Sequence, residues 1–224
     1  MEYSPPADAW VFHGGLSKFH AAKLIFQAHP ELLEARQFAF LDPDIIIDHR
    51  CLVALMQRGE AQGRGIYQAA VSHQSSTFWD ILYQQPAISG WQETSFVEVM
   101  APCFSAAALK RCLPRFDASI STWGLDFLWF DLCHDLSMGV YHDLTMTHPT
   151  EVDTVDGPFY RYLQSRGIDP HREVRLIRQE MAWLYYPCNV PAIFAGRLKK
   201  PYVYARRLLS LPGLALRKLW RALR

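Results

Sequence analysis

The sequence predicts a single α/β domain built on a mostly parallel, twisted sheet with helices on both faces. Two observations lead to this fold class. Apolar segments of strand length alternate along the chain with segments of helical periodicity, an order typical of strands joined by crossover helices. Half of the 224 residues are hydrophobic and 13% are aromatic, so the chain can bury a full core and does not have the composition of a disordered protein.

The first half of the chain is predicted to supply three strands and three helical segments. The strands are expected at residues 9–12, 37–41 and 66–71. The helices are expected at residues 17–28, 31–35 and 49–58. Ser17 and Asp48 stand where the N-caps of the two longer helices belong. Pro30 should end the first of these helices, because the residue before a proline avoids the α region.

The second half of the chain continues the alternation. Strands are expected at residues 96–100 and 139–147. Helices are expected at residues 105–113, 124–132, 157–164 and 171–185. Pro102 should end the first of these strands, and Ser105 is placed to cap the helix that follows it.

The charges divide the chain into two parts. The formal net charge is +1, yet residues 1–180 carry a net −8, while nine Lys and Arg side chains and no acidic ones follow Glu180. We therefore interpret residues 1–185 as the domain and residues 186–224 as a basic, amphipathic, helical tail. The tail suits an anionic membrane surface, and a helix packed on the domain is the alternative. The acidic body argues against a nucleic-acid partner.

The cysteines and the apolar segments indicate a cytoplasmic protein. Five Cys occur without the spacing of a metal site or a CxxC motif, so reduced thiols are expected. The N-terminus lacks the basic and apolar regions of a signal peptide, and no segment approaches ~20 uninterrupted apolar residues. The membrane interpretation of the tail would add a peripheral association with the inner face of the membrane.

Asp42-Pro43-Asp44 is the first candidate for a functional site. This segment directly follows the strand predicted at residues 37–41, and ligands of open α/β sheets bind beyond the carboxyl ends of strands. Two carboxylates one residue apart can turn toward one divalent ion, and their hard oxygens suit Mg²⁺ or Mn²⁺ shared with substrate phosphates. The alternative is an ordinary β-turn, in which Asp and Pro are the expected residues.

Further motifs give this segment a context. Phe40-Leu41-Asp42-Pro43-Asp44 is followed by Phe96-Val97-Glu98-Val99-Met100-Ala101-Pro102, by Trp123-Gly124-Leu125-Asp126, and by Gly139-Val140-Tyr141-His142-Asp143 with His148. In this order the motifs resemble the lysine-ketoglutarate-reductase trans-splicing-related family, a domain of unknown function that is similar to GT-A fold glycosyltransferases. The resemblance covers residues 15–148 and implies a GT-A-like catalytic domain over residues 1–185. This domain would be N-terminally shortened, because only residues 9–15 precede the first long helix.

The resemblance implies a metal site at three of these residues. Asp42 and Asp44 match the Asp-x-Asp motif that binds Mn²⁺ or Mg²⁺ and, through the metal, the diphosphate of a nucleotide-sugar donor. His148 falls where a histidine often completes such a site, and a surface-loop histidine is the alternative. Pro43 departs from the family pattern, which has an acidic residue at this position.

The resemblance also implies residues that bind the substrate or act on it. Asp126 stands where an acidic residue often acts as the general base, although the first turn of a helix also favours an acid for its dipole. Trp123 could stack on a sugar ring or simply pack in the core. Gly124 and Glu98 are assigned to substrate binding. For Glu98 the alternative, a structural role as a buried partner of an arginine or a backbone donor, is slightly preferred.

Three functions remain open at this point. The leading hypothesis is metal-dependent transfer of a sugar from a nucleotide-sugar donor to a hydroxyl group of a carbohydrate or lipid-linked acceptor. The second is a non-catalytic relative that binds carbohydrate or a partner protein and has lost donor turnover. The third is a metal-dependent hydrolase that uses the same carboxylates.

Overall fold

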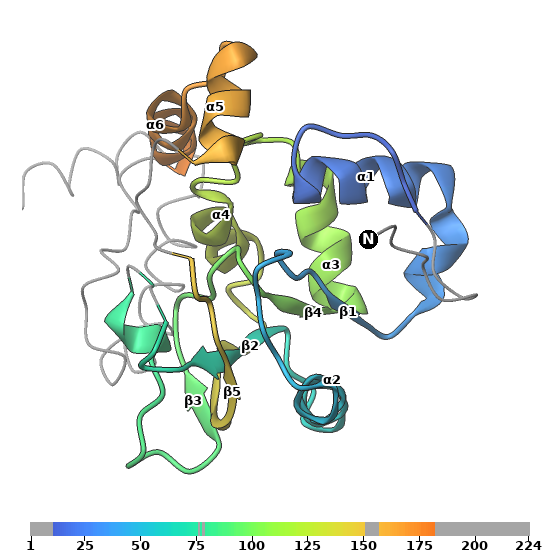
Figure 1. The fold of residues 1–224 in the computed structure, drawn as a ribbon. Coiled ribbons are helices and arrows are strands. Elements are labelled where there is room, and N and C mark those ends of the chain that lie inside the picture. Colours follow the sequence, from blue (N-terminus) through green and yellow to red (C-terminus); the bar gives the residue numbers. More distant parts are fainter. Residues whose placement is uncertain (1–10, 76, 78, 151–156, 182–224) are drawn as a thin grey trace, which may run out of the picture.

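The computed structural model describes residues 11–75, 77, 79–150 and 157–181, which form an α/β fold around one sheet (Figure 1). The sheet has five strands in the order β1-β4-β2-β5-β3. The strands are β1 (Gln37–Ala39), β2 (Ile66–Val71), β3 (Trp91–Glu93), β4 (Cys103–Ser105) and β5 (Met138–Met146). All six residues of β2 are buried, so this strand lies at the centre of the core.

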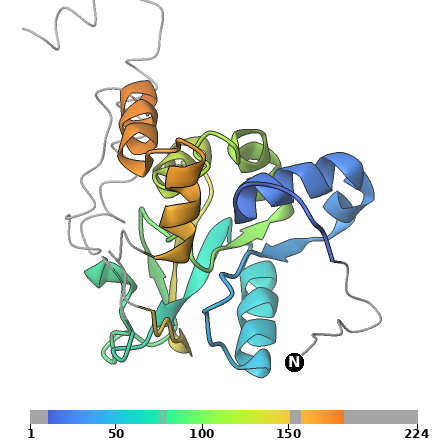
Figure 2. The same ribbon diagram turned by 45° about the horizontal axis from the view of Figure 1, so that its top comes forward.

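Helices cover both faces of the sheet, as predicted. The α-helices of the described residues are α1 (Lys18–Ala28), α2 (His49–Ala61), α3 (Ala106–Cys112), α4 (Leu125–Leu132), α5 (Pro158–Ser165) and α6 (Pro170–Met181). The 3-10 segments are η1 (Pro30–Glu34), η2 (Asp80–Leu82) and η3 (Leu113–Arg115). In both ribbon views α2 lies on one side of the sheet, and α1, α3 and α4 lie on the other (Figures 1 and 2). The orange helices α5 and α6 stack on the α4 side.

The sheet is mixed, so the prediction of a mostly parallel sheet is wrong. Only β2 and β5 pair in parallel, whereas β1 with β4, β2 with β4, and β3 with β5 are antiparallel. The reason is that β4 inserts between β1 and β2, and β3 adds an antiparallel edge. Strands β1, β2 and β5 nevertheless run in the same direction, because β4 is antiparallel to both of its neighbours. Their carboxyl ends therefore meet at one edge of the sheet.

Two of the expected strands are wrong in the described residues. Residues 96–100 form no strand, and the nearest strand, β4, begins only at Cys103. Most of the apolar residues of this segment are buried without strand pairing: the ring of Phe96 lies 4.7 Å from that of Trp79 and 5.9 Å from that of Phe127. Residues 11–12 of the strand expected at 9–12 are also irregular, and residues 9–10 lie outside the described chain.

The predicted helix starts are confirmed. Ser17 Oγ accepts a hydrogen bond from the backbone N–H of His20, and Asp48 Oδ1 accepts one from that of Arg50 at 2.8 Å. Ser105 Oγ caps α3 in the same way. These caps depend only on neighbouring residues, so they could be identified before the fold was known.

Residues 182–224 lie outside the described part of the chain, so the structure says nothing about the predicted tail or the end of the helix expected at 171–185. Within the described residues, no helix has both the length and the apolar character needed to span a membrane. Cys51, Cys103, Cys112 and Cys133 are free thiols, as expected, and three of them are buried.

Candidate functional site

A cavity of about 820 Å³ opens beyond the carboxyl ends of β1 and β5. Its volume is typical of a site for a small-molecule ligand or cofactor. Every residue that the sequence assigns to the site lines this cavity, and together they come from four separate segments of the chain. They are Asp42, Asp44, Glu98, Trp123, Gly124, Asp126 and His148.

The main chain of Asp42 is held by the sheet. The pairing of β1 with β4 continues past the end of both strands, since the N–H of Phe40 donates to the carbonyl of Pro102 at 3.0 Å. The N–H of Asp42 likewise donates to the carbonyl of Met100 at 2.9 Å. The Asp-Pro-Asp segment therefore starts from a fixed position, and the turn that was its alternative interpretation is present at residues 43–44. Asp44 can therefore belong both to this turn and to the site.

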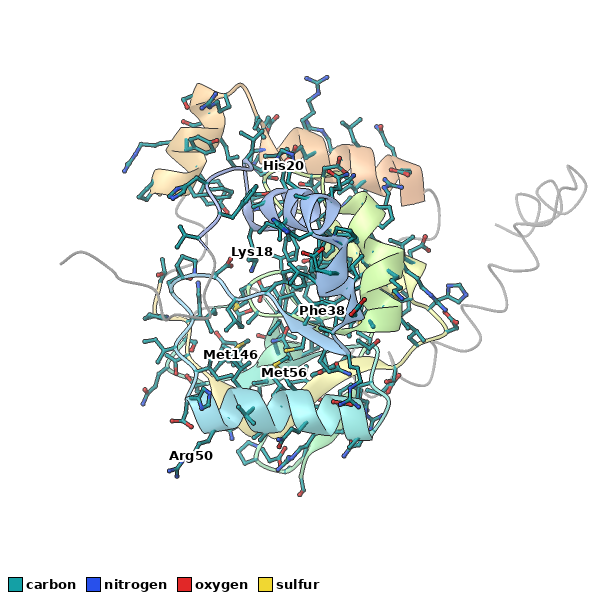
Figure 3. All side chains as sticks on the ribbon, turned by 90° about the vertical axis from the view of Figure 1, so that its right-hand side faces the viewer. Lys18, His20, Phe38, Arg50, Met56 and Met146 are labelled. Carbon is teal, nitrogen blue, oxygen red and sulfur yellow. The ribbon has the colours of Figure 1, made fainter. Side chains whose placement is uncertain are left out.

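Lys18, which was not predicted for the site, lies beside Asp42. Its Nζ is 2.8 Å from Asp42 Oδ1, and it donates to the carbonyl oxygens of Val99 at 2.8 Å and Met100 at 3.0 Å. The carbonyl of Phe40 is a further acceptor at 3.2 Å. Figure 3 shows Lys18 on the side of α1 that faces the sheet, with His20 on the opposite side.

Burial lowers the pKa of the Lys18 ammonium, and the nearby carboxylate of Asp42 opposes this shift. The sequence did contain a signal for this residue. A lysine at the first position of a helix faces the positive end of the helix dipole, which is unfavourable unless another charge compensates. Asp42 supplies that compensation.

A short bridge brings Asp44 and His148 together. Ile46 and Thr147 exchange two backbone hydrogen bonds of 2.9 Å, which join the loop after Asp44 to the end of β5. As a result, His148 Nε2 lies 3.3 Å from Asp44 Oδ2. The side chain of His148 is only 9% exposed, and its backbone N–H donates to Ser75 Oγ, so it is not the surface-loop histidine of the alternative interpretation.

These contacts decide how a divalent metal could fit. Asp44 offers an oxygen and His148 a nitrogen, a donor pair that suits Mn²⁺. Asp42 offers its remaining oxygen, because Lys18 occupies the other. Among the described residues, no three or more His, Cys, Asp or Glu side chains are grouped as a ready metal site. The arrangement fits a metal that takes two protein ligands and completes its coordination with substrate phosphates.

Asp126 lies buried in the first turn of α4, with only 7% of its surface exposed. Its Oδ1 accepts a hydrogen bond of 2.9 Å from the backbone N–H of Phe127. Burial raises the pKa of Asp126 to about 7, while backbone hydrogen bonds and the charge of Arg178 oppose the shift. A carboxyl group poised near neutral pH in a cavity has the properties of a general base. Asp126 also lies in the first turn of a helix, so its structural interpretation, as an acid that complements the helix dipole, agrees with the structure as well.

The loop before α4 is held in an unusual conformation. Thr122 has a φ of 71° and Gly124 a φ of 89°, both in the left-handed region, which is strained for a β-branched residue such as Thr. The carboxylate of Glu173 in α6 clamps this loop from outside. It accepts hydrogen bonds from the backbone N–H groups of Ile120 at 2.9 Å and Ser121 at 2.8 Å. Helix α6 thereby positions the start of α4 and with it Asp126.

Glu98 is a second buried carboxyl group in the cavity, and it is also 7% exposed. Its backbone N–H donates to Gln68 Oε1 at 2.9 Å, and its side-chain Oε2 accepts from Thr77 Oγ1 at 2.9 Å. Burial raises the pKa of Glu98 to about 8, and the charges of Asp126 and Asp42 add to the rise. Glu98 is therefore mostly a neutral acid at pH 7, able to donate a hydrogen bond into the cavity.

Trp123 forms an aromatic corner with two residues that were not predicted, Tyr160 and His171. Its ring is nearly perpendicular to those of Tyr160 at 6.1 Å and His171 at 5.1 Å, and its Nε1–H donates to Tyr160 Oη at 3.1 Å. All three rings line the cavity. Trp123 is half-buried, so its ring is neither a wholly buried core residue nor a free surface platform. The corner can receive one face of a flat or ring-shaped ligand.

The cavity thus combines Asp42, Asp44 and His148, whose side chains could together hold a cation, with a second group of lining residues that includes Trp123 and Asp126. Neither the protein-family models nor the curated proteins compared with this chain match it. The roles of the site residues therefore depend on their chemistry and geometry.

Proposed function

We propose that this chain is a GT-A-like glycosyltransferase that moves a sugar from a nucleotide donor to a hydroxyl acceptor with the help of Mn²⁺ or Mg²⁺. The observation that carries the proposal is the convergence of Asp42, Asp44, Asp126 and His148 on one cavity beside Trp123. These residues are separated by up to 106 positions in the sequence. They include both a cation-binding group and a buried carboxyl group that can accept a proton.

The charges around the cavity support a requirement for metal. Lys18 and Arg178 are the Lys and Arg side chains among its described lining residues; Lys18 pairs with Asp42, and the charge of Arg178 acts on the buried Asp126. A diphosphate brought into this environment would meet no excess of positive charge. A divalent ion held by Asp44 and His148, with Asp42 beside it, would supply that charge and stabilise the leaving diphosphate.

The other residues would then act on the acceptor. Asp126 would take the proton from the acceptor hydroxyl as that oxygen attacks the sugar. Glu98, as a neutral acid, would donate a hydrogen bond to the substrate. Trp123 would stack on the face of a sugar ring, and Gly124 would leave room for it beside α6. A lipid-linked acceptor would agree with the basic tail predicted at residues 186–224.

Thermal unfolding with a panel of nucleotide sugars tests donor binding. A donor present at about 100 times its Kd stabilises the folded chain by about 2.7 kcal/mol, which corresponds to roughly 5–10 °C in Tm for a chain of this size. We expect this protection with Mn²⁺ and its loss with EDTA or in Asp44→Asn. A panel that gives no protection with either metal would refute the proposal.

Turnover distinguishes the three functions. Release of nucleoside diphosphate only when an acceptor is present, and its loss in Asp126→Asn with donor protection retained, is the expected result. Donor or sugar binding without turnover would identify the non-catalytic relative. Release of free sugar in the absence of acceptor would identify the hydrolase, for which Glu98 and Asp126 would serve as the acid and base.

A further inference from the structure

The two carboxylates of the Asp-Pro-Asp segment have different partners. Asp42 is paired with the ammonium of Lys18, whose Nζ lies 2.8 Å from Asp42 Oδ1. Asp44 faces His148 at 3.3 Å, an imidazole that can itself bind a metal. The segment therefore does not present two equivalent ligands to an incoming ion.

Lys18 is held in a cage of oxygens. Its ammonium has three N–H donors but four oxygen neighbours within 3.2 Å: the Asp42 carboxylate and the backbone carbonyls of Phe40, Val99 and Met100. Three of these acceptors are backbone carbonyls next to the β1–β4 pairing, so they cannot rotate away from the ammonium as a side chain could. The cage resembles the oxygen coordination of a metal ion, with the ammonium as the bound cation.

Because of this cage, a divalent ion that approaches Asp42 must compete with Lys18. The ammonium and the ion would both need the same carboxylate, and their like charges repel at short distance. Asp44 instead lies 3.3 Å from His148 Nε2, an imidazole that can itself ligate the ion rather than compete with it. The ion should therefore bind first on the Asp44 side.

We propose that Lys18 is the resident cation of the site and competes with the divalent metal for Asp42. The metal is held by Asp44 and His148, and Asp42 becomes a full ligand only when Lys18 is removed or displaced. The inference deepens the metal site of the proposed function, on which it rests, but it requires neither donor binding nor turnover.

A double-mutant cycle measured by Mn²⁺ calorimetry tests this competition. The four proteins are the unmodified chain, Lys18→Met, Asp42→Asn and the double variant. We expect Lys18→Met to bind Mn²⁺ more tightly, because a charge is removed and a ligand is gained. We expect Asp42→Asn to weaken Mn²⁺ binding about tenfold more in the Lys18→Met background than in the unmodified chain, a typical effect for a residue that supports a metal site.

Lys23 provides a matched control on the same helix. Its side chain is 19% exposed against 20% for Lys18, and it pairs with Asp117 at 2.7 Å, away from the cavity. Lys23→Met should leave Mn²⁺ affinity unchanged within twofold. If Lys23→Met tightens Mn²⁺ binding as much as Lys18→Met does, a loosened α1 rather than competition is the cause, and the inference fails.

The remaining outcomes are equally decisive. Additive effects in the cycle, or no Mn²⁺ binding by either the unmodified chain or Lys18→Met, would overturn the inference. Lys18→Gln replaces Lys18→Met if the latter does not fold, because its amide still donates to two carbonyls. Non-additive Mn²⁺ binding without donor binding would refute the proposed function and leave this inference standing.

Discussion

Replacement of Glu98 by Gln should stabilise the protein at alkaline pH and have little effect at acidic pH. Burial raises the pKa of Glu98 from its ordinary 4.5 to about 8, so the folded chain holds this proton over a pH range in which the unfolded chain has lost it. The stability that this proton contributes is fully present below pH 4.5 and is lost as the pH rises toward 8. Glutamine keeps the oxygen that accepts from Thr77 but cannot ionise.

The magnitude follows from the size of the pKa shift. Each pH unit between the two pKa values changes the free energy of unfolding by about 1.4 kcal/mol. Between pH 5 and pH 8 the unmodified chain should therefore lose about 3–4 kcal/mol through Glu98, and Glu98→Gln should not. Asp126, whose pKa is raised to about 7 by burial, adds a loss of the same sign to both proteins.

Urea unfolding at pH 5 and pH 8 measures the difference. With a slope of about 2 kcal/mol per M, the midpoint of Glu98→Gln should exceed that of the unmodified chain by roughly 1.5–2 M at pH 8 and nearly match it at pH 5. Glu34→Gln, which removes an exposed carboxylate, is the control and should show no such divergence. Parallel pH dependences for Glu98→Gln and the unmodified chain would refute the assignment of a buried, protonated Glu98.

Three further predictions concern other parts of the chain. Asp44→Asn should weaken Mn²⁺ binding about tenfold in calorimetry with little change in Tm, because its side chain is 37% exposed. Gly124→Ala should cost about 1–3 kcal/mol in urea unfolding, more than Gly167→Ala: both have positive φ, but only at Gly124 would the new Cβ meet α6, at 3.2 Å. In a liposome flotation assay, the intact chain should float with anionic vesicles at low salt but not at high salt. A chain that ends at Gly196 should stay folded and should not float. If this shortened chain unfolds, the tail packs on the domain instead.

The features that could be predicted from the sequence are those set by neighbouring residues. Ser17, Asp48 and Ser105 cap helices because a short side chain meets an N–H group two or three residues ahead. Strand order could not be predicted in this way. The insertion of β4 between β1 and β2 depends on contacts between Gln37–Ala39 and Cys103–Ser105, and no local periodicity encodes that pairing.

The same distinction between local and long-range contacts separates the site residues that could be predicted from those that could not. Asp42 and His148 could be placed near a sheet edge because each follows a strand, and strands of one direction end together. The helix start of Lys18 signals only that it needs a compensating charge; its place in the site could not be predicted, because three of its oxygen partners are the carbonyls of residues 22, 81 and 82 positions away. Carbonyl groups occur at every residue, so the sequence carries no mark of which ones will surround a lysine. Tyr160 and His171 were missed for the same reason: their meeting with Trp123 depends on how α5 and α6 fold back.

The two sides of the cavity are supported by different parts of the fold, and this matters for how the site can change. The side with Asp42, Asp44 and His148 is fixed by main-chain hydrogen bonds that continue the sheet, at Asp42 and across the Ile46–Thr147 bridge. The side with Asp126 depends instead on Glu173, a side chain of α6 that holds a strained loop. Substitutions on α6 can therefore reshape the part of the cavity around Asp126 while the part around Asp42, Asp44 and His148 stays in place. Under the proposed function, such a site would keep one donor chemistry and vary the acceptor, because only one of its two supports would have to move.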